Sequence, residues 1–442
     1  MALAQGSGEL IWWPYIIAKY GLAFLCLLIP ACLLQFPINY AIGSYTLLTG
    51  ETIFQGLIRV NRVIACVLWG LLAISFLWFG SFASAGGTAI AALTRFPPGW
   101  DARGQTLFWA YLSMAIFFVA LAASRVVYTV VERFMELVAV VTLVGLVVAC
   151  SHPTVLAHAP PFMRGLVLPQ WPPPRPWDSA DATKLLTAIT FAGLGGFWTL
   201  FYSYWLREKG VGMAKAMGRV EGLAGRHEVG FDTGSIPQDA PVEQVGRWRR
   251  FLMVDTAVGI GGNLLTTLMT CLLAYAVLHP HGLLPDKYEL AVVQSRFFEL
   301  SWGTAGRMLF LIVAAAFLCD TWMATADAVA RIHTDCLMSF FPALRRWSVR
   351  RLYFACLFAG TLITAVTMPL TEPGPLILLS ALIGFLGTVS YAALLYALNH
   401  RWLPQHLDRR LCPQRGALIG LVIAGIAYAA LAVAYLRVRF VL

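Results

Sequence analysis

The chain has 442 residues, of which 59% are hydrophobic and 12% are charged. A soluble domain carries roughly a quarter charged residues, so the composition excludes a water-soluble fold and predicts one membrane domain of about ten or eleven spans. The net charge of +10 does not indicate nucleic acid, because basic residues collect in alternate loops, as in a multi-pass protein of the cytoplasmic membrane whose basic loops face the cytoplasm.

Apolar runs bounded by charged residues, proline or glycine predict the membrane spans, and a shorter apolar run at 10–20 precedes them. The region 10–48 can be divided in two ways. It forms either a half-helix followed by a full span, or one span over 10–34 followed by the more polar QFPINYAIGSYT, and the charges of the later loops fit both. The predicted spans are 22–48, 63–93, 107–123, 130–150, 185–206, 251–278, 304–328, 352–370, 375–398 and 416–436.

Two connections are longer than the others. The first, 151–184, contains PQWPPPRPW, and because proline fixes φ and lacks an N–H donor, we expect an extended segment on the outer side. The second, 207–248, is basic and rich in glycine. Its GVGMAKAMG lacks the Gly-Lys-Ser/Thr ending of a phosphate-binding loop, so this connection is predicted to be a cytoplasmic connector.

The side chains that build enzyme sites are scattered along the sequence. The nine cysteines include no Cys-x-x-Cys pair, and most lie within or beside apolar runs, which is typical of buried small hydrophobic side chains. The eight histidines fall in loops or at span ends, and His279 and His281 lack a third metal ligand. We therefore expect no cofactor, no nucleic-acid partner and no enzyme activity, and the oligomeric state stays open.

Three glycines, Gly193, Gly195 and Gly196, interrupt the apolar run 185–206. Small residues in a span either allow close helix packing or mark a break whose backbone is satisfied by protein or water. A second interruption, GSGE at Gly6–Glu9, stands directly before the apolar LIWWPYIIAKYG. Paired breaks at matching places in two halves are typical of transporters built from inverted repeats, with the solute site where both helices unwind.

Three stretches resemble the Nramp family of divalent-metal transporters, in family order and over most of the chain. Leu33–Gln55 is similar to the second helix through Leu-Leu-Gln and a Thr-Gly followed by an acidic residue, Tyr128–Val141 to the fifth helix, and 185–209 to the broken sixth helix. The resemblance implies an all-α LeuT-type fold of two inverted five-helix repeats plus one extra helix, with about 10–11 transmembrane helices. The first helix is expected to be truncated, because only MALAQ precedes Gly6.

The same resemblance gives the expected layout of the chain. A single transmembrane transporter domain covers all 442 residues. Its parts are a first repeat of about 1–150, the outer Pro-rich loop 151–184, a second repeat of about 185–398 and the extra helix at about 416–436.

The resemblance also implies a secondary-active transporter that moves a divalent metal cation by alternating access. The family binds metal through an Asp and an Asn on the first helix and an Ala and a Met on the sixth; Gly6, Glu9, Gly193 and Gly196 stand in their places. Because the sulfur ligand is lost, these residues favour a hard cation such as Mg²⁺ or Mn²⁺. Two alternatives stay open: a transporter for a small organic solute, and a relative that no longer transports.

Charged side chains inside spans are costly and are therefore candidates for function. Glu9, beside the first interruption, is one candidate for contact with the solute. Asp320, within the predicted span 304–328, is another, as a metal ligand or proton relay. Asp327 is predicted to cap a helix or to pair with Arg331, its i,i+4 neighbour.

The remaining polar groups in the spans have structural interpretations. Glu132 and Glu136 are predicted to pair with nearby arginines, and Asp255 lies near the start of the seventh helix. Asn263 is placed to hydrogen-bond across the bundle. The third span, with LWFGSFASAGGTAIAAL, holds no carboxylate, so the proton coupling of the Nramp family does not carry over.

Overall fold

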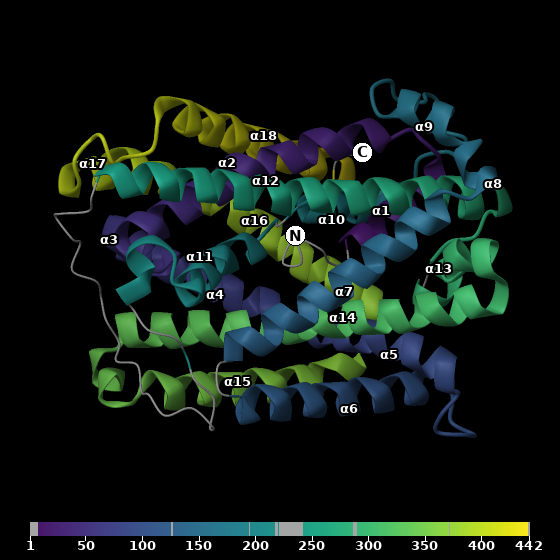
Figure 1. The fold of residues 1–442 in the computed structure, drawn as a ribbon, viewed down its shortest axis with the longest axis horizontal. Coiled ribbons are helices and arrows are strands. Elements are labelled where there is room, and N and C mark those ends of the chain that lie inside the picture. Colours follow the sequence, from purple (N-terminus) through teal and green to yellow (C-terminus); the bar gives the residue numbers. More distant parts are fainter. Residues whose placement is uncertain are drawn as a thin grey trace.

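The computed structural model describes residues 8–124, 127–193, 195–216, 220, 242–285, 290–370 and 372–440, and every regular element within these ranges is a helix. Nine of the described helices are long and apolar enough to cross a membrane. The chain is therefore a multi-pass membrane protein, as its composition predicts. Figure 1 shows several of the long helices side by side along the longest axis of the molecule.

The region 10–48 forms a half-helix followed by a full span, which is the first of the two predicted arrangements. The half-helix ends at Gly21, whose φ of 60° lies in the left-handed region. The elements up to residue 150 are the π-helical turn η2 (Gly8–Trp12), α1 (Trp13–Tyr20), η3 (Leu25–Leu27), α2 (Leu28–Thr49), α3 (Ile53–Val60), α4 (Arg62–Ser75), η4 (Phe76–Trp78), α5 (Gly80–Thr94), α6 (Ala102–Ala123) and α7 (Val127–Cys150).

The connection 151–184 is extended over only part of its length. Residues 169–178, which hold the proline-rich PQWPPPRPW, contain no helix, as predicted. The prediction was wrong for the residues before and after them, where the chain forms short helices that begin at or near prolines or polar caps. These are α8 (Pro153–Leu156), α9 (Ala159–Gly165) and η5 (Ser179–Asp181).

The predicted span 185–206 is two short helices rather than one. Beyond it, the second part of the chain consists mainly of long helices joined by short ones. The elements are α10 (Ala182–Phe191), α11 (Trp198–Lys209), η6 (Gly212–Ala216), α12 (Val242–Leu273), η7 (Ala274–Leu278), η8 (His279–His281), α13 (Leu290–Gln294), α14 (Arg296–Phe340), η10 (Pro342–Arg346), α15 (Val349–Thr367), η11 (Met368–Leu370), α16 (Pro373–Ala397), η12 (Leu398–Trp402), α17 (Leu403–His406) and α18 (Arg415–Phe440).

The helix α14 is longer than the span predicted at 304–328. It bends at Gly303, where φ is 56°, and then continues to Phe340. The turns beyond residue 328 carry Arg331 and Asp335, which are buried like Asp327 just before them. A hydropathy pattern stops at such charges, whereas the folded helix continues because the charges are paired inside the bundle.

The two ends of the bundle differ in chemistry. One end, called the basic end here, holds α3, η10 and α17, with the exposed Arg62, Arg345, Arg346 and Arg401. The other end, called the Pro-rich end, holds α8, α9 and residues 169–178. Figure 1 shows α3 and α17 at the left and α8, α9 and α13 at the right. The alternate-loop pattern of basic residues thus corresponds to one end of the folded molecule.

The broken helix pair lies between two groups of long helices. In Figure 1, α2, α12 and α18 lie on one side and α5, α6, α14 and α15 on the other, with α10, α11 and α16 between them. The packing partners agree: α2 contacts α11, α12 and α18, whereas α5 contacts α6, α14 and α16. This arrangement places the helix break deep inside the protein.

Glycines let α5 approach its neighbours closely. A Cβ at Gly86 would lie 2.5 Å from the Sγ atom of Cys319 on α14, and a Cβ at Gly87 would lie 2.5 Å from the carbonyl oxygen of Thr106 on α6. Real Cβ contacts are not this short, so the small residues of FASAGGTAIAAL are required by helix packing. Gly70 on α4, by contrast, has no atom within 4 Å of its Cβ position.

The packing at Gly87 can be tested with Gly87→Ala. The added methyl group must push α5 away from the backbone of α6, and we expect a loss of about 1–3 kcal/mol in the free energy of unfolding. Gly70→Ala is the matched control, because it faces open space and gains roughly 0.5–1 kcal/mol from better helix propensity. Thermal unfolding in detergent measures both; equal midpoints for the two variants would contradict this packing.

Candidate functional site

The triple glycine is a genuine helix break. α10 ends at Phe191 and α11 begins at Trp198. Gly193 and Gly196 have φ values of 89° and 63°, in the region that favours glycine. At Gly195 a Cβ would lie 1.5 Å from the carbonyl oxygen of Thr190, so no other residue fits there. Each of the three glycines is therefore needed for the break.

Two neighbouring helices supply hydrogen bonds that the broken helix has lost. The N–H of Gly193 donates to Oδ1 of Asn263 on α12 at 2.9 Å, and the hydroxyl of Tyr391 on α16 donates to the carbonyl oxygen of Gly196 at 2.8 Å. The predicted cross-bundle role of Asn263 is confirmed, whereas Tyr391 was not anticipated. No described donor reaches the carbonyl oxygens of Ala192 and Gly193, although both residues are buried.

Aromatic rings surround the start of α11. The indole of Trp198 lies 4.7 Å from the ring of Phe76, 5.2 Å from that of Phe191 and 6.0 Å from that of Phe82, measured between ring centres. Its Nε1 donates to Oγ1 of Thr325 on α14 at 3.2 Å. The start of α11 thus has apolar surroundings, while the carbonyl oxygens of Ala192 and Gly193 before it accept no hydrogen bond from described residues.

The structure brings only some of the predicted site residues together. Gly193 and Gly196 lie at the break. Gly6 lies outside the described residues. Glu9 belongs to η2, which packs against α10, the first half of the broken helix, but only its backbone is described.

Asp320 is buried in α14 with 7% of its surface exposed, and its Oδ1 has no hydrogen-bond partner among the described residues. No hydrogen bond therefore joins this carboxylate oxygen to the break. A carboxylate at membrane depth without a partner is costly, so protonation or a bound cation is needed to neutralise it.

Arg331 forms the centre of a buried network near the basic end. Its Nε lies 2.9 Å from Oδ2 of Asp327, as the i,i+4 spacing predicts, and its Nη1 bonds Glu208 on α11. Asp327 also accepts hydrogen bonds from Tyr353 at 2.7 Å and from Trp205 at 3.3 Å. The network joins α14 to α11 and α15, so it fastens the second half of the broken helix to the bundle.

A second acidic group makes a similar connection. Asp335 accepts hydrogen bonds from Thr52, from Nε2 of Gln55 at 2.9 Å and from the hydroxyl of Tyr204 at 2.8 Å. It thus links the start of α3 and the middle of α11 to α14. The hydropathy pattern does not reveal this group, because the predicted span ends at residue 328.

Carboxylates outside α14 contact residues of other helices or lie exposed. Glu132 lies 3.7 Å from Nζ of Lys209, and Glu136 is exposed on α7. Asp255 accepts a hydrogen bond from Tyr202 on α11 at 2.7 Å. The lysine that Glu132 contacts comes from the end of α11, far away in the sequence, and the predicted pairing with nearby arginines stays a prediction.

Asp181 joins the two half-helices at the Pro-rich end. Its carboxylate lies between Nζ of Lys19 on α1 and Nζ of Lys184 on α10, the latter at 2.9 Å, and accepts a hydrogen bond from Tyr20 at 2.8 Å. Burial by itself would raise the pKa of Asp181, but the hydrogen bonds from the two lysines outweigh it and hold the pKa below the ordinary value of 3.8.

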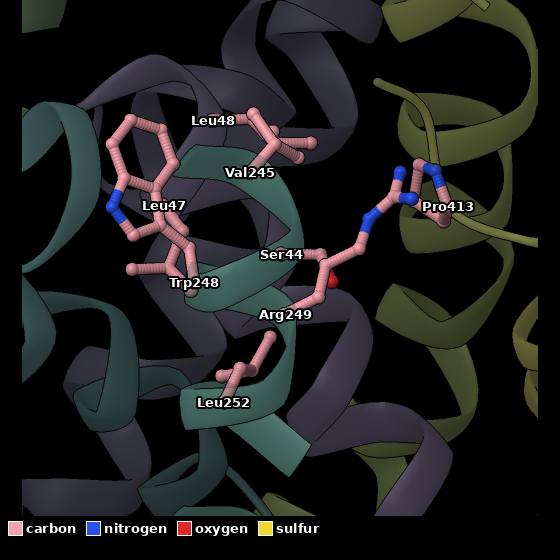
Figure 2. A pocket seen from close by; sticks show the side chains of 8 residues that line it. All are labelled: Ser44, Leu47, Leu48, Val245, Trp248, Arg249, Leu252 and Pro413. Carbon is pink, nitrogen blue, oxygen red and sulfur yellow. The ribbon is translucent and has the colours of Figure 1, made fainter. Parts of the chain in front are cut away.

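A groove at the basic end is too small for a solute. Figure 2 shows Arg249 extending from α12 toward Pro413, and the volume of the groove is about 10 Å³, room for one water molecule. The guanidinium of Arg249 donates to the carbonyl oxygens of Leu411, at 2.7 Å, and Cys412. The residues that line the groove are Ser44, Leu47, Leu48, Val245, Trp248, Arg249, Leu252 and Pro413.

Among the residues that the structure describes, no three His, Cys, Asp or Glu side chains lie close enough to hold a metal ion together. A cation site built from the described part of the chain would therefore need further ligands, and backbone or amide oxygens are suitable ones for a hard cation.

No family model and no curated protein matches the sequence. Solved structures match over 99% of this chain. MhsT in complex with L-phenylalanine is 14% identical, with a TM-score of 0.64 and 97% of its chain covered. The nucleobase-cation-symport-1 family transporter Mhp1 is 12% identical, with a TM-score of 0.58 and 91% covered. The manganese transporter of Eremococcus coleocola is 12% identical, with a TM-score of 0.61 and 85% covered.

These structures define the fold class. The chain has the LeuT-type transporter fold, in which α10 and α11 are the two halves of the broken sixth helix. The resemblance to the Nramp family is therefore supported at the level of the fold. At 12–14% identity these structures indicate only the fold. They do not indicate the ligand, which depends on the residues of the site.

Arg331→Met tests the network near the basic end. It leaves Asp327 and Glu208 buried without their cation, and we expect the free energy of unfolding to fall by about 3–5 kcal/mol. Arg346→Met removes an exposed arginine and is the matched control. Thermal unfolding measures both variants, and adding Glu208→Gln to Arg331→Met should restore part of the loss. If Arg331→Met alone were as stable as Arg346→Met, this would contradict a stabilising role of the network.

The two lysines around Asp181 predict that the stability of the fold decreases at acidic pH. Because the folded-state pKa of Asp181 lies below 3.8, its contribution to stability is complete above that pH and is lost as the pH falls through the folded-state pKa. Unfolding midpoints measured from neutral pH downward should therefore fall more steeply in the wild type than in Asp181→Asn. Parallel curves for the two proteins would show that the cluster does not act in this way.

Proposed function

We propose that the protein is a secondary-active transporter of a divalent cation, a hard one such as Mg²⁺ or Mn²⁺, that works by alternating access. The observation that supports this most is the break between α10 and α11, where the carbonyl oxygens of Ala192 and Gly193 are buried and accept no hydrogen bond from described residues. Free carbonyl oxygens at a broken membrane helix are the groups with which transporters of this architecture bind cations.

The charge that complements the cation is proposed to come from acidic side chains. Glu9 follows the first interruption, on the turn that packs against α10, and would supply one carboxylate. Asp320 would supply a second negative charge in α14, as a further ligand or as a proton relay. With Gly196 in place of a methionine, the site offers oxygen rather than sulfur, and this favours a hard cation.

The proposed cycle uses the groups at both ends of the bundle. Asp181 ties α1 to α10 at the Pro-rich end, while Arg331 and Asp335 tie α11 to α14 near the basic end. The flexible glycines between them would let α10 and α11 move separately. We further propose that the basic end faces the cytoplasm, that the membrane is the cytoplasmic one, and that the repeats cover about 1–150 and 185–398.

Titration of the purified protein with Mg²⁺ and Mn²⁺ tests the proposal, together with uptake into proteoliposomes. We expect saturable binding that Glu9→Gln and Asp320→Asn each weaken at least about tenfold, which is about 1.4 kcal/mol. Glu136→Gln, on an exposed face of α7, is the control and should bind like the wild type. Binding that is unchanged in both site variants would contradict this assignment.

A small organic solute is the second candidate. It is favoured by the rings of Phe76, Phe82 and Phe191 around Trp198, which provide an apolar surface beside the break. L-phenylalanine, the ligand bound in the similar MhsT structure, is the first probe. Binding of this amino acid that is lost in Trp198→Ala, without binding of either cation, would favour this candidate. Absence of any binding or uptake would favour a relative that no longer transports.

A further inference from the structure

The side chain of Gln35 lies against the helix break. Gln35 is on α2 and is fully buried, with 0% of its surface exposed. A Cβ placed on Gly193 would lie 3.2 Å from Cγ of Gln35, and one placed on Gly195 would lie 3.0 Å from its Nε2. Because both glycines belong to the unwound segment, the amide of Gln35 faces that segment directly.

Only one half of this amide is hydrogen-bonded. Nε2 donates to the hydroxyl of Tyr428 on α18, whose ring is fully buried and lies 6.0 Å from the ring of Phe385. Oε1 is buried and has no partner among the described residues. A buried amide oxygen without a donor is costly, and such groups are rare unless a ligand or an ion occupies the place of the donor.

A purely structural role does not account for the amide. If Gln35 served only to pack against the glycines, an aliphatic side chain such as leucine would fill the space without an unsatisfied polar group. The unpaired Oε1 belongs to a side chain whose Cγ and Nε2 lie against the unwound segment, and the carbonyl oxygens of Ala192 and Gly193 in that segment accept no hydrogen bond from described residues. Buried oxygen atoms without donors, from α2 and from the break, are a ligand set for a hard cation.

We propose that Oε1 of Gln35 is a ligand of the transported cation, together with carbonyl oxygens of the break, and that Tyr428 positions it. This inference rests on the proposed function, because it names a further ligand of the same cation. It also gives α18, the predicted extra helix outside the two repeats, a role in positioning this ligand. By holding Nε2 of Gln35, Tyr428 fixes the rotation of the amide and directs the opposite oxygen away from itself.

The test is isothermal titration of the purified full chain with Mg²⁺ and Mn²⁺. Gln35→Leu keeps most of the volume and removes the oxygen, so we expect affinity to fall at least about tenfold. Gln35→Glu has nearly the same shape and adds a carboxylate, so affinity should rise by about tenfold or more near neutral pH and fall again in acid. Tyr428→Phe should give an intermediate loss, because Gln35 is present but no longer held.

Gln105→Glu is the matched control, since Gln105 lies at the start of α6 and donates to the carbonyl oxygen of Pro97. It should bind cations like the wild type. If Gln35→Leu does not fold, the role of Gln35 is tested by comparing the cation affinity of Gln35→Glu with that of the wild type. Wild-type affinity in Gln35→Leu, or in Gln35→Glu at neutral pH, would overturn the role of Gln35 and leave the proposed function intact. Absence of cation binding by the wild type would overturn both.

Discussion

The rest of the structure depends on the cost of an unbonded backbone group at membrane depth. A continuous helix meets this cost by itself, but α10 and α11 are separated by residues that cannot be helical. The surrounding helices are arranged to compensate. Asn263 and Tyr391 reach the break from α12 and α16, and the glycines let it pass between tightly packed neighbours. Among the described residues, the carbonyl oxygens of Ala192 and Gly193 are left there without a donor.

Charged side chains are distributed unevenly along the bundle. Ion pairs and charged networks lie toward the ends, around Asp181 at the Pro-rich end and around Arg331 toward the basic end. The region of the break is held mainly by neutral hydrogen bonds from amide and hydroxyl groups. Neutral hydrogen bonds are weaker than charge-assisted ones, so the middle of the broken helix is held less firmly than its two ends.

Composition and local pattern were sufficient to predict the membrane class and most of the spans. The glycines at 193–196 alone fit either close packing or a break, and the paired interruption at Gly6–Glu9 favoured the break. Contacts between side chains that are far apart in the sequence could not be predicted in this way. The end of α14 was placed at residue 328, because Asp335 and its partners Thr52 and Tyr204 come together only in the fold. Gln35 and Tyr428, which are 393 residues apart, likewise carry no local signal. Arg331 was found because its partner is on the same helix.

The helix α18 faces the surroundings over most of its length, since only 17% of its most apolar stretch is buried. It is nevertheless attached at three levels. Arg249 of α12 donates a hydrogen bond to the loop before α18. Gln35 of α2 donates to Tyr428 in the middle of α18. Near the far end, the hydroxyl of Thr183 on α10 lies 3.0 Å from that of Tyr435. Of these three helices, α2 contacts both α10 and α12. A displacement of any of them would therefore act on α18 through these hydrogen bonds, so α18 would move with them and change its contacts with the surrounding lipid.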